Sequence, residues 1–138
     1  MTHPEIGHMK IQPHPNDLYP GNCPYHTTCL EGLANAPSLS ARWNADPETL
    51  PDDHPAWDFE AFYLGQAIHN LILVCSPKRF ILGGGVLKRR GLIEKVRIEA
   101  VRILNGYIKT SYLDTIDEYI MSPRSEERRV GKECRSRW

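Results

Sequence analysis

The sequence contains no long run of apolar residues and no excess of either charge. Its longest uninterrupted apolar stretch, Leu71 to Cys75, has five residues, whereas a helix needs about 20 to cross a bilayer. No basic N-terminal stretch precedes an apolar segment, so no secretory signal is evident. Basic and acidic residues balance at 17 each, which argues against a protein that binds polyanions. These absences predict a cytoplasmic protein that binds neither membranes nor nucleic acid.

Cysteine is also scarce, with four in 138 residues. Two of the four flank a histidine within one short segment, a pattern that favours a metal site in a reducing compartment over a disulfide scaffold. The length suits one domain, and a composition of 41% hydrophobic and 25% charged residues is typical of a globular protein.

The last 15 residues differ from the rest. Residues 124–138 hold six basic and three acidic side chains, so residues 1–123 carry a net charge of −3. The only apolar side chains of this tail are Val130, Cys134 and Trp138. They bury too little area to offset an ordering cost of about 1–2 kcal/mol per residue, although their spacing leaves a short amphipathic helix open. We expect a disordered native tail or a non-native, vector-derived end.

Periodicity divides residues 1–123 into two segments. In the first, residues 1–54, prolines predict loops, with a strand only at Ile6–Ile11 and a helix from Leu30 to Trp43. In the second, residues 55–123, helical spacing predicts helices over 56–75 and 91–107. Asp52, Asp53 and Pro55 form the expected helix start. Short strands are predicted at 80–82 and 117–121, and this alternation indicates an α/β fold.

Four potential metal ligands lie in the first segment, in the pattern H-x14-C-x2-H-x2-C. They are His8, Cys23, His26 and Cys29. A Cys2His2 set satisfies tetrahedral zinc completely, so it predicts a closed structural site. A loop with so little apolar content also needs a metal to order it. Coincidence remains an alternative, and by spacing alone His3 or His14 could replace His8; His54 and His69 are the other competing histidines.

Several motifs together resemble a known family. They are His3-Pro4-Glu5-Ile6-Gly7-His8, Cys23-Pro24-Tyr25-His26, Cys29-Leu30-Glu31-Gly32-Leu33-Ala34, Arg42-Trp43, His54-Pro55-Ala56-Trp57 and Ile81-Leu82-Gly83-Gly84-Gly85-Val86. Over residues 2–123 the chain resembles the sugar kinases of the ROK family, in particular the fructokinase branch. The resemblance implies the C-terminal lobe of an actin-like, ribonuclease-H-like sugar kinase with a zinc-binding loop.

The resemblance also implies residue roles. Glu5, His8 and Glu31 would face the hexose, and His8 would bind zinc through its other nitrogen. Carboxylates accept hydrogen bonds from paired hydroxyls, which suits a polyol pocket. The loop of Gly83, Gly84 and Gly85 would line the ATP cleft, with magnesium on the phosphates. Without the resemblance, Glu31 is equally well an exposed acid at a helix start, and the glycines a flexible turn, since they match neither a Walker loop nor a dinucleotide motif.

The family's catalytic aspartate and its phosphate loops have no counterpart here. We therefore expect a C-terminal lobe truncated at both ends and inactive alone, from a parent enzyme that phosphorylates fructose with ATP and forms a homodimer, as relatives commonly do. The alternative is a sugar-sensing ROK repressor, but its zinc loop usually reads Cys-x-Cys-Gly rather than Cys-Pro-Tyr-His. A nucleic-acid-binding zinc ribbon is disfavoured because no lysine or arginine lies between Lys10 and Arg42.

Overall fold

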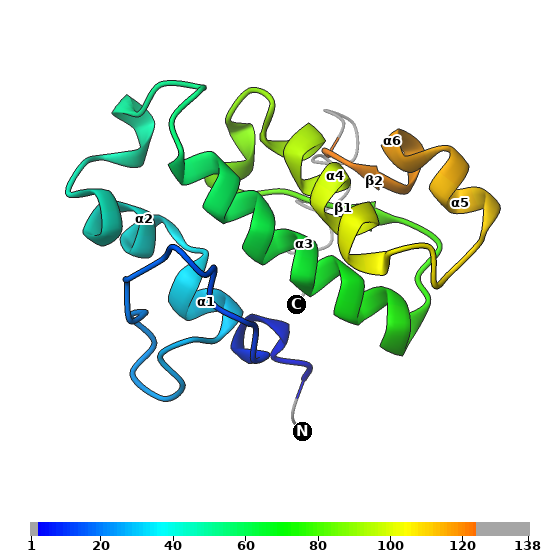
Figure 1. Ribbon diagram of the computed structural model, residues 1–138, viewed down its shortest axis with the longest axis horizontal. Helices are drawn as coiled ribbons and strands as arrows, with labels where there is room; N and C mark the ends of the chain where they lie inside the picture. Colours follow the sequence, from blue (N-terminus) through cyan, green and yellow to red (C-terminus); the bar gives the residue numbers. More distant parts are fainter. Residues whose placement is uncertain (1–2, 124–138) are drawn as a thin grey trace, which may run out of the picture.

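A single long helix, α3 (Ala56–Cys75), organises the chain. The computed structural model describes residues 3–123. In Figure 1, α3 runs between the N-terminal loops with the short helices α1 and α2, and the C-terminal region that contains α4 and the two strands. The predicted tail, residues 124–138, lies outside the described residues. The helix predicted over 56–75 is confirmed, with the same bounds.

Helix α4 (Leu92–Leu104) packs along α3 and forms the larger apolar core with it. The two helices approach closely at Gly65, where an added Cβ would lie 2.7 Å from the Cβ of Glu99. Leu92, Val96 and Ala100 of α4 are completely buried in this core, as their helical spacing requires. The predicted helix over 91–107 is therefore confirmed, but it ends at Leu104 because Asn105 adopts a left-handed conformation.

The C-terminal region contains two short parallel strands, β1 (Phe80–Ile81) and β2 (Ile120–Met121). Phe80 is paired with Ile120 and Ile81 with Met121. The connection between them contains η3 (Val86–Lys88), α4, α5 (Ser111–Asp114) and α6 (Ile116–Tyr119). The predicted strand at 117–121 is wrong in its first half, because residues 116–119 form α6 and only the last two pair.

The N-terminal region consists mostly of loops and short helices: η1 (Ile6–His8), α1 (Leu30–Leu33), α2 (Ala36–Trp43) and η2 (Pro47–Thr49). The strand predicted at Ile6–Ile11 is wrong. Residues 6–8 form a 3-10 turn, and only Lys10 pairs, in an isolated bridge with Cys29. The single helix predicted from Leu30 to Trp43 is also wrong. Asn35 caps α2 by accepting a hydrogen bond from the Ser38 N–H, and this separates α2 from α1.

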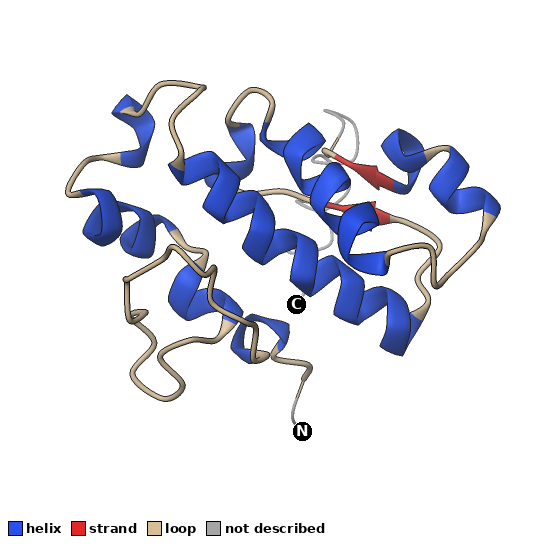
Figure 2. Cartoon of the chain, in the orientation of Figure 1, coloured by secondary structure: helices blue, strands red, loops and turns tan. Residues whose placement is uncertain are grey.

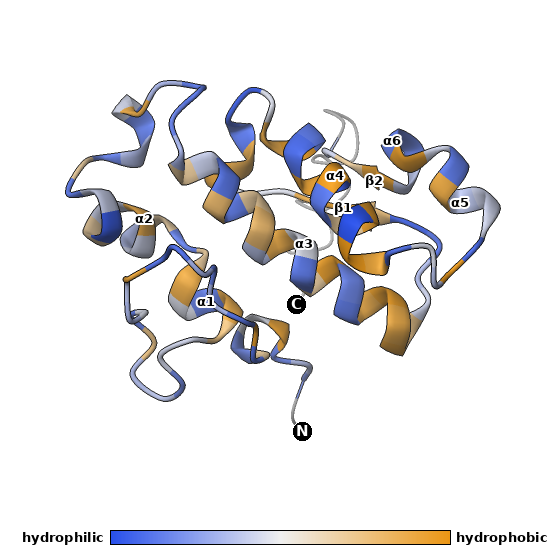
Figure 3. Cartoon of the chain, in the orientation of Figure 1, coloured by the Kyte–Doolittle hydropathy of each residue, from blue (hydrophilic) through white to orange (hydrophobic). Residues whose placement is uncertain are grey.

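The predicted start of α3 is right in position but wrong in detail. Neither Asp52 nor Asp53 caps the helix; instead the Ala56 N–H donates to Nδ1 of His54, at 3.2 Å. The fold is mixed helix and strand, with helix predominating in the described residues (Figure 2). Apolar residues concentrate along α3 and the strands (Figure 3). Between residues 3 and 123, no helix combines the length and the hydropathy needed to cross a membrane.

Candidate functional site

The four predicted metal ligands come together in the N-terminal region. The donor atoms of His8, Cys23, His26 and Cys29 all lie within 4.8 Å of one another. Nδ1 of His8 is 3.7 Å from Sγ of Cys23 and 3.8 Å from Sγ of Cys29, and Nδ1 of His26 is 3.8 Å from Sγ of Cys23. Ordinary zinc bond lengths give a tetrahedral N–S edge of about 3.6 Å, so the donor set fits a zinc ion.

The competing histidines are placed elsewhere. The ring of His14 packs on Phe59 and Phe62, with centroids 4.6 and 4.9 Å apart. His54 accepts the hydrogen bond at the start of α3, and neither His3 nor His69 belongs to the ligand cluster. Spacing alone left His8 interchangeable with His3 or His14, and the geometry selects His8.

Backbone contacts hold the ligand loop in a tight turn. The Thr27 N–H donates to the Cys23 carbonyl at 3.0 Å, and Thr27 adopts a left-handed conformation. The Thr27 carbonyl then lies against α1, where a Cβ on Gly32 would be only 2.0 Å from its oxygen. Glycine is therefore required at position 32, because any side chain would push the loop away from α1.

The two thiols differ in acidity. Burial of the Cys23 sulfur raises its pKa, but hydrogen bonds from the backbone of Tyr25 and His26 and from the side chains of Cys29 and His26 outweigh burial and lower it to about 6. Burial raises the pKa of Cys29, and a nearby Cys23 thiolate raises it further. One thiolate thus forms readily near neutral pH, and thiolates are the form that binds metals.

A pocket of about 320 Å³ adjoins this cluster. His8 and Glu31 both line it, and Nε2 of His8, the nitrogen opposite the thiols, is 3.5 Å from Oε2 of Glu31. Both side chains remain partly exposed, as ligand-binding groups must be. Glu5 does not line this pocket, and its carboxylate is 3.4 Å from Nδ1 of His3. The structure therefore brings two of the three predicted hexose-facing residues together.

A larger cleft of about 770 Å³ lies between α2, η2 and η3. Of the three glycines, only Gly85 lines it; Gly83 packs against Pro123, and Gly84 has a φ of +125°. Acidic side chains in and around η2 and basic side chains at the end of η3 and just after it line the cleft: Asp46, Glu48, Asp52, Lys88, Arg89 and Arg90. Both volumes fall in the usual range for small-molecule sites.

Arg89 connects the two sides of the larger cleft. Its guanidinium donates to Asp52 at 3.0 Å and to the Pro47 carbonyl at 2.9 Å. It also lies over the ring of Trp57, 4.7 Å from the centroid, an attractive cation–π geometry. The sequence alone indicates no role for Arg89, because its partners lie more than 30 residues away and no motif marks them.

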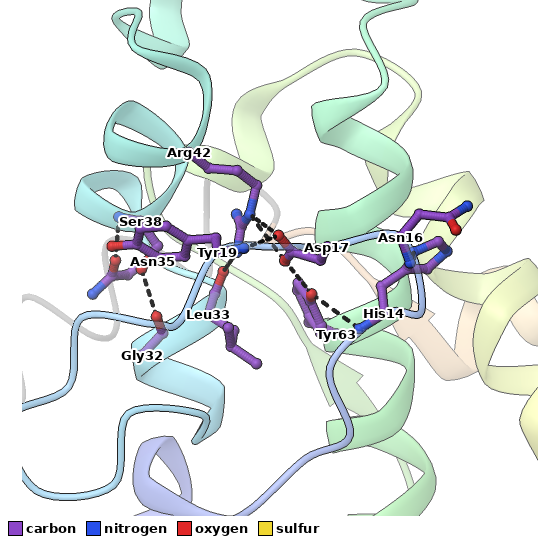
Figure 4. A network of polar contacts seen from close by, with 10 residues as sticks. All are labelled: His14, Asn16, Asp17, Tyr19, Gly32, Leu33, Asn35, Ser38, Arg42 and Tyr63. Carbon is purple, nitrogen blue, oxygen red and sulfur yellow. Dashed lines mark hydrogen bonds and ion pairs between the residues drawn. The ribbon is translucent and has the colours of Figure 1, made fainter.

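A buried polar network, which no sequence motif indicates, lies near the loop that carries the Cys2His2 cluster (Figure 4). Nε of Arg42 lies 3.0–3.1 Å from the Asp17 carboxylate, and the hydroxyl of Tyr63 donates to the same carboxylate. Burial raises the pKa of Tyr63, as does its hydrogen bond to Asp17, so this hydroxyl remains a donor. The three residues come from a loop, α2 and α3, and no spacing in the sequence connects them.

These features define a class of protein: a mixed helix-and-strand chain with a Cys2His2 cluster beside a small polar pocket, and a glycine loop beside a larger cleft. The model of the ROK family matches residues 1–122. The chain belongs to the ROK family, whose fold is that of the actin-like sugar kinases. The predicted family resemblance is confirmed.

Several curated proteins similar to this chain are named as fructokinases. The chain is 42% identical over 90% of its length to the Bacillus subtilis (strain 168) protein named "Putative fructokinase". It is 38% identical over 87% of its length to the fructokinase of Pediococcus pentosaceus, and 35% over 92% to that of Streptococcus mutans. It spans 41–43% of the length of these relatives.

Proposed function

We propose that this chain is part of an ATP-dependent fructokinase, which transfers the γ-phosphoryl group of ATP to D-fructose and forms fructose 6-phosphate. The printed names of the relatives support this proposal, and the two adjacent pockets described above are consistent with it. The observation that carries most weight is the placement of Glu31 and His8 on one pocket beside the Cys2His2 cluster. The repressor alternative is supported by no feature of the described residues.

In this proposal zinc has a structural role, and its four ligands leave no position open for a catalytic water. His8 binds it through Nδ1, which leaves the Nε2 proton directed toward Glu31 and the pocket. A carboxylate that accepts a hydrogen bond from this N–H would fix the tautomer and the ring orientation of His8. Glu31 then accepts hydrogen bonds from sugar hydroxyls, and Glu5 stays a proposed hexose ligand that the described pocket does not include.

We place the nucleotide in the larger cleft. Gly85 allows close approach of the backbone, as expected for the loop of residues 83–85, and magnesium would accompany the phosphates of ATP. The acids of the η2 loop can accept hydrogen bonds from ribose hydroxyls, while Lys88 and Arg90 offer positive charge. Catalysis in phosphoryl transfer depends chiefly on positioning and electrostatic stabilisation.

Calorimetric titration of the 138-residue chain with fructose, glucose and mannose tests the hexose site. We expect Glu31→Gln to weaken binding of the preferred hexose at least tenfold, because an amide accepts fewer hydrogen bonds than a carboxylate. Glu118→Gln, on the exposed surface of α6, is the matched control and should change nothing. Equal affinity of the parent and the Glu31→Gln chain would contradict the assignment.

Turnover by this chain alone is not expected. Between residues 3 and 123, no aspartate lines the pocket beside His8 and Glu31, and the one carboxylate that does, Glu31, is assigned to binding the hexose and not to removing its proton. A coupled assay with ATP, magnesium and fructose measures this directly. A rate in the ordinary enzyme range of about 1–10³ per second would show that a base is present after all.

A further inference from the structure

The buried network of Asp17, Arg42 and Tyr63 connects three elements that are distant in sequence. The Arg42 and Asp17 side chains are only 5% and 1% exposed. Arg42 also donates to the Leu33 carbonyl of α1 at 3.0 Å and lies over the ring of Tyr19, 4.8 Å from its centroid. The Asp17 carboxylate accepts the Tyr19 N–H at 3.0 Å. The network therefore ties the loop that leads into the metal-binding turn to α1, α2 and α3.

Helix α2 is shared by the two pockets. Asn35, its N-cap, lines the pocket beside His8 and Glu31, whereas Ala36, Pro37 and Ser40 line the larger cleft. Ser38 Oγ donates to the Gly32 carbonyl at 2.8 Å, and Asn22 Nδ2 donates to Asn35 Oδ1 at 3.3 Å. A shift of α2 would thus alter both pockets, and Arg42 anchors its C-terminal turn.

The network is poorly explained as a source of stability. Moving two charges out of water costs about as much as their attraction returns, so a buried ion pair is weak evidence for a stability role. Nη1 of Arg42 and Oε2 of nearby Glu60 are buried without a hydrogen-bond partner in the described part of the chain, which adds to the cost. What the network does provide is a fixed geometry, because the rigid, planar guanidinium of Arg42 donates from Nε to the Asp17 carboxylate and at the same time from Nη2 to the Leu33 carbonyl.

We propose that Asp17, Arg42 and Tyr63 are positioning residues that hold the metal-binding loop and α2 in register, so that the hexose pocket and the nucleotide cleft keep one relative arrangement. This inference rests on the proposed function of the two pockets. None of the three residues lines either pocket, so their effect on ligands is indirect. Removing the Asp17 charge leaves Arg42 buried and unpaired, and the loop and α2 then lose their common anchor.

The test compares Asp17→Asn with Leu104→Ala in the 138-residue chain, at a temperature where both remain folded. Leu104 is buried at the end of α4, among residues of the larger core, so its truncation lowers stability without touching the network. We expect Asp17→Asn to weaken fructose and ATP binding at least tenfold each, and Leu104→Ala to leave both affinities within twofold of the parent. Equal effects of the two variants, or an unchanged affinity in Asp17→Asn, would overturn the proposal.

Two further measurements make the result specific. Arg42→Lys keeps a positive charge opposite Asp17 and should retain more affinity than Arg42→Met, which leaves the Asp17 carboxylate buried and unpaired. A role in packing alone would not produce this difference. Amide hydrogen exchange should accelerate in residues 14–43 of Asp17→Asn but not of Leu104→Ala. If the parent binds neither ligand, the proposed function fails, and the exchange comparison alone still decides whether the network positions this region.

Discussion

The regions on the two sides of α3 are held together in different ways. The C-terminal side is an apolar core, in which Val96 and Ala100 of α4 are completely buried against α3. The N-terminal side contributes Leu39 and Leu50 to this core, but its own apolar cluster of Ile11, Leu33 and Tyr63 is much smaller. It also contains the Cys2His2 cluster and a buried ion pair. The C-terminal side therefore owes its shape mainly to hydrophobic burial, and the N-terminal side owes more of its shape to directional contacts.

The largest expected effect comes from removing the metal ligands. Cys23→Ser combined with Cys29→Ser should reduce bound zinc from about one per chain to none, because serine is a poor zinc ligand. The N-terminal region should lose its order while the α3–α4 helices remain. Elemental analysis and far-ultraviolet circular dichroism measure the two outcomes. Cys75→Ser, at an exposed cysteine outside the cluster, is the control; full zinc content in the double variant would refute the ligand assignment.

A large-to-small change in the apolar core should lower the stability of the chain without affecting its zinc content. Leu104→Ala should lower the free energy of unfolding by about 2–5 kcal/mol, the usual cost of a leucine-sized cavity, and leave the zinc content unchanged. Chemical denaturation and elemental analysis measure these quantities. Ile98→Ala, on the exposed face of the same helix, should cost much less, and a loss of zinc in Leu104→Ala would mean that the two regions are not independent.

A smaller, pH-dependent effect is expected at Glu60, which is almost completely buried in α3. Burial raises its pKa from 4.5 to about 8, and Arg42 lowers it only in part. Between these values the folded chain keeps a proton that the unfolded chain has released, so stability falls as the pH rises.

Glu60→Gln should therefore remove a slope on the order of 1 kcal/mol per pH unit between about pH 5 and 8. Thermal or chemical unfolding across this range measures it. Glu118→Gln, at an exposed position, should reproduce the parent curve. A Glu60→Gln chain with the same pH dependence as the parent would show that Glu60 ionises in the folded state.

The smallest expected effect is that of deleting residues 124–138. Their few apolar side chains predict no contribution to either region, so the thermal midpoint and the zinc content should both stay within error of the full chain. Differential scanning calorimetry and elemental analysis measure the two. A large fall in either quantity would show that the tail is part of the fold.

The difference between the two sides of α3 also explains which elements the sequence could predict. The helices α3 and α4 were predictable because apolar side chains such as Ile68, Val96 and Leu104 recur at helical spacing. In the N-terminal region the spacing of Cys23, His26 and Cys29 predicted the ligand cluster, but not which upstream histidine completes it. That choice depends on the path of the chain through residues 9–22, which no periodicity encodes.

The incorrect predictions for the N-terminal region also arise from contacts that periodicity does not show. Residues 6–11 have strand-like composition, but in the described part of the chain only Lys10 among them pairs, in the single bridge with Cys29, and Gly7 lies against Glu31. The break between α1 and α2 comes from the Asn35 cap, which a continuous helical pattern conceals. The Asp17–Arg42 contact joins residues 25 positions apart, and such long-range polar pairs leave no mark in a single sequence.

We expect a metal to order the N-terminal region, while apolar packing independently orders the C-terminal region. Amide hydrogen exchange of the zinc-loaded chain, before and after removal of the metal by a chelator, tests it most directly. We expect protection to be lost in residues 8–34 and retained in residues 56–104. Unchanged protection in both segments, or an equal loss in both, would contradict it.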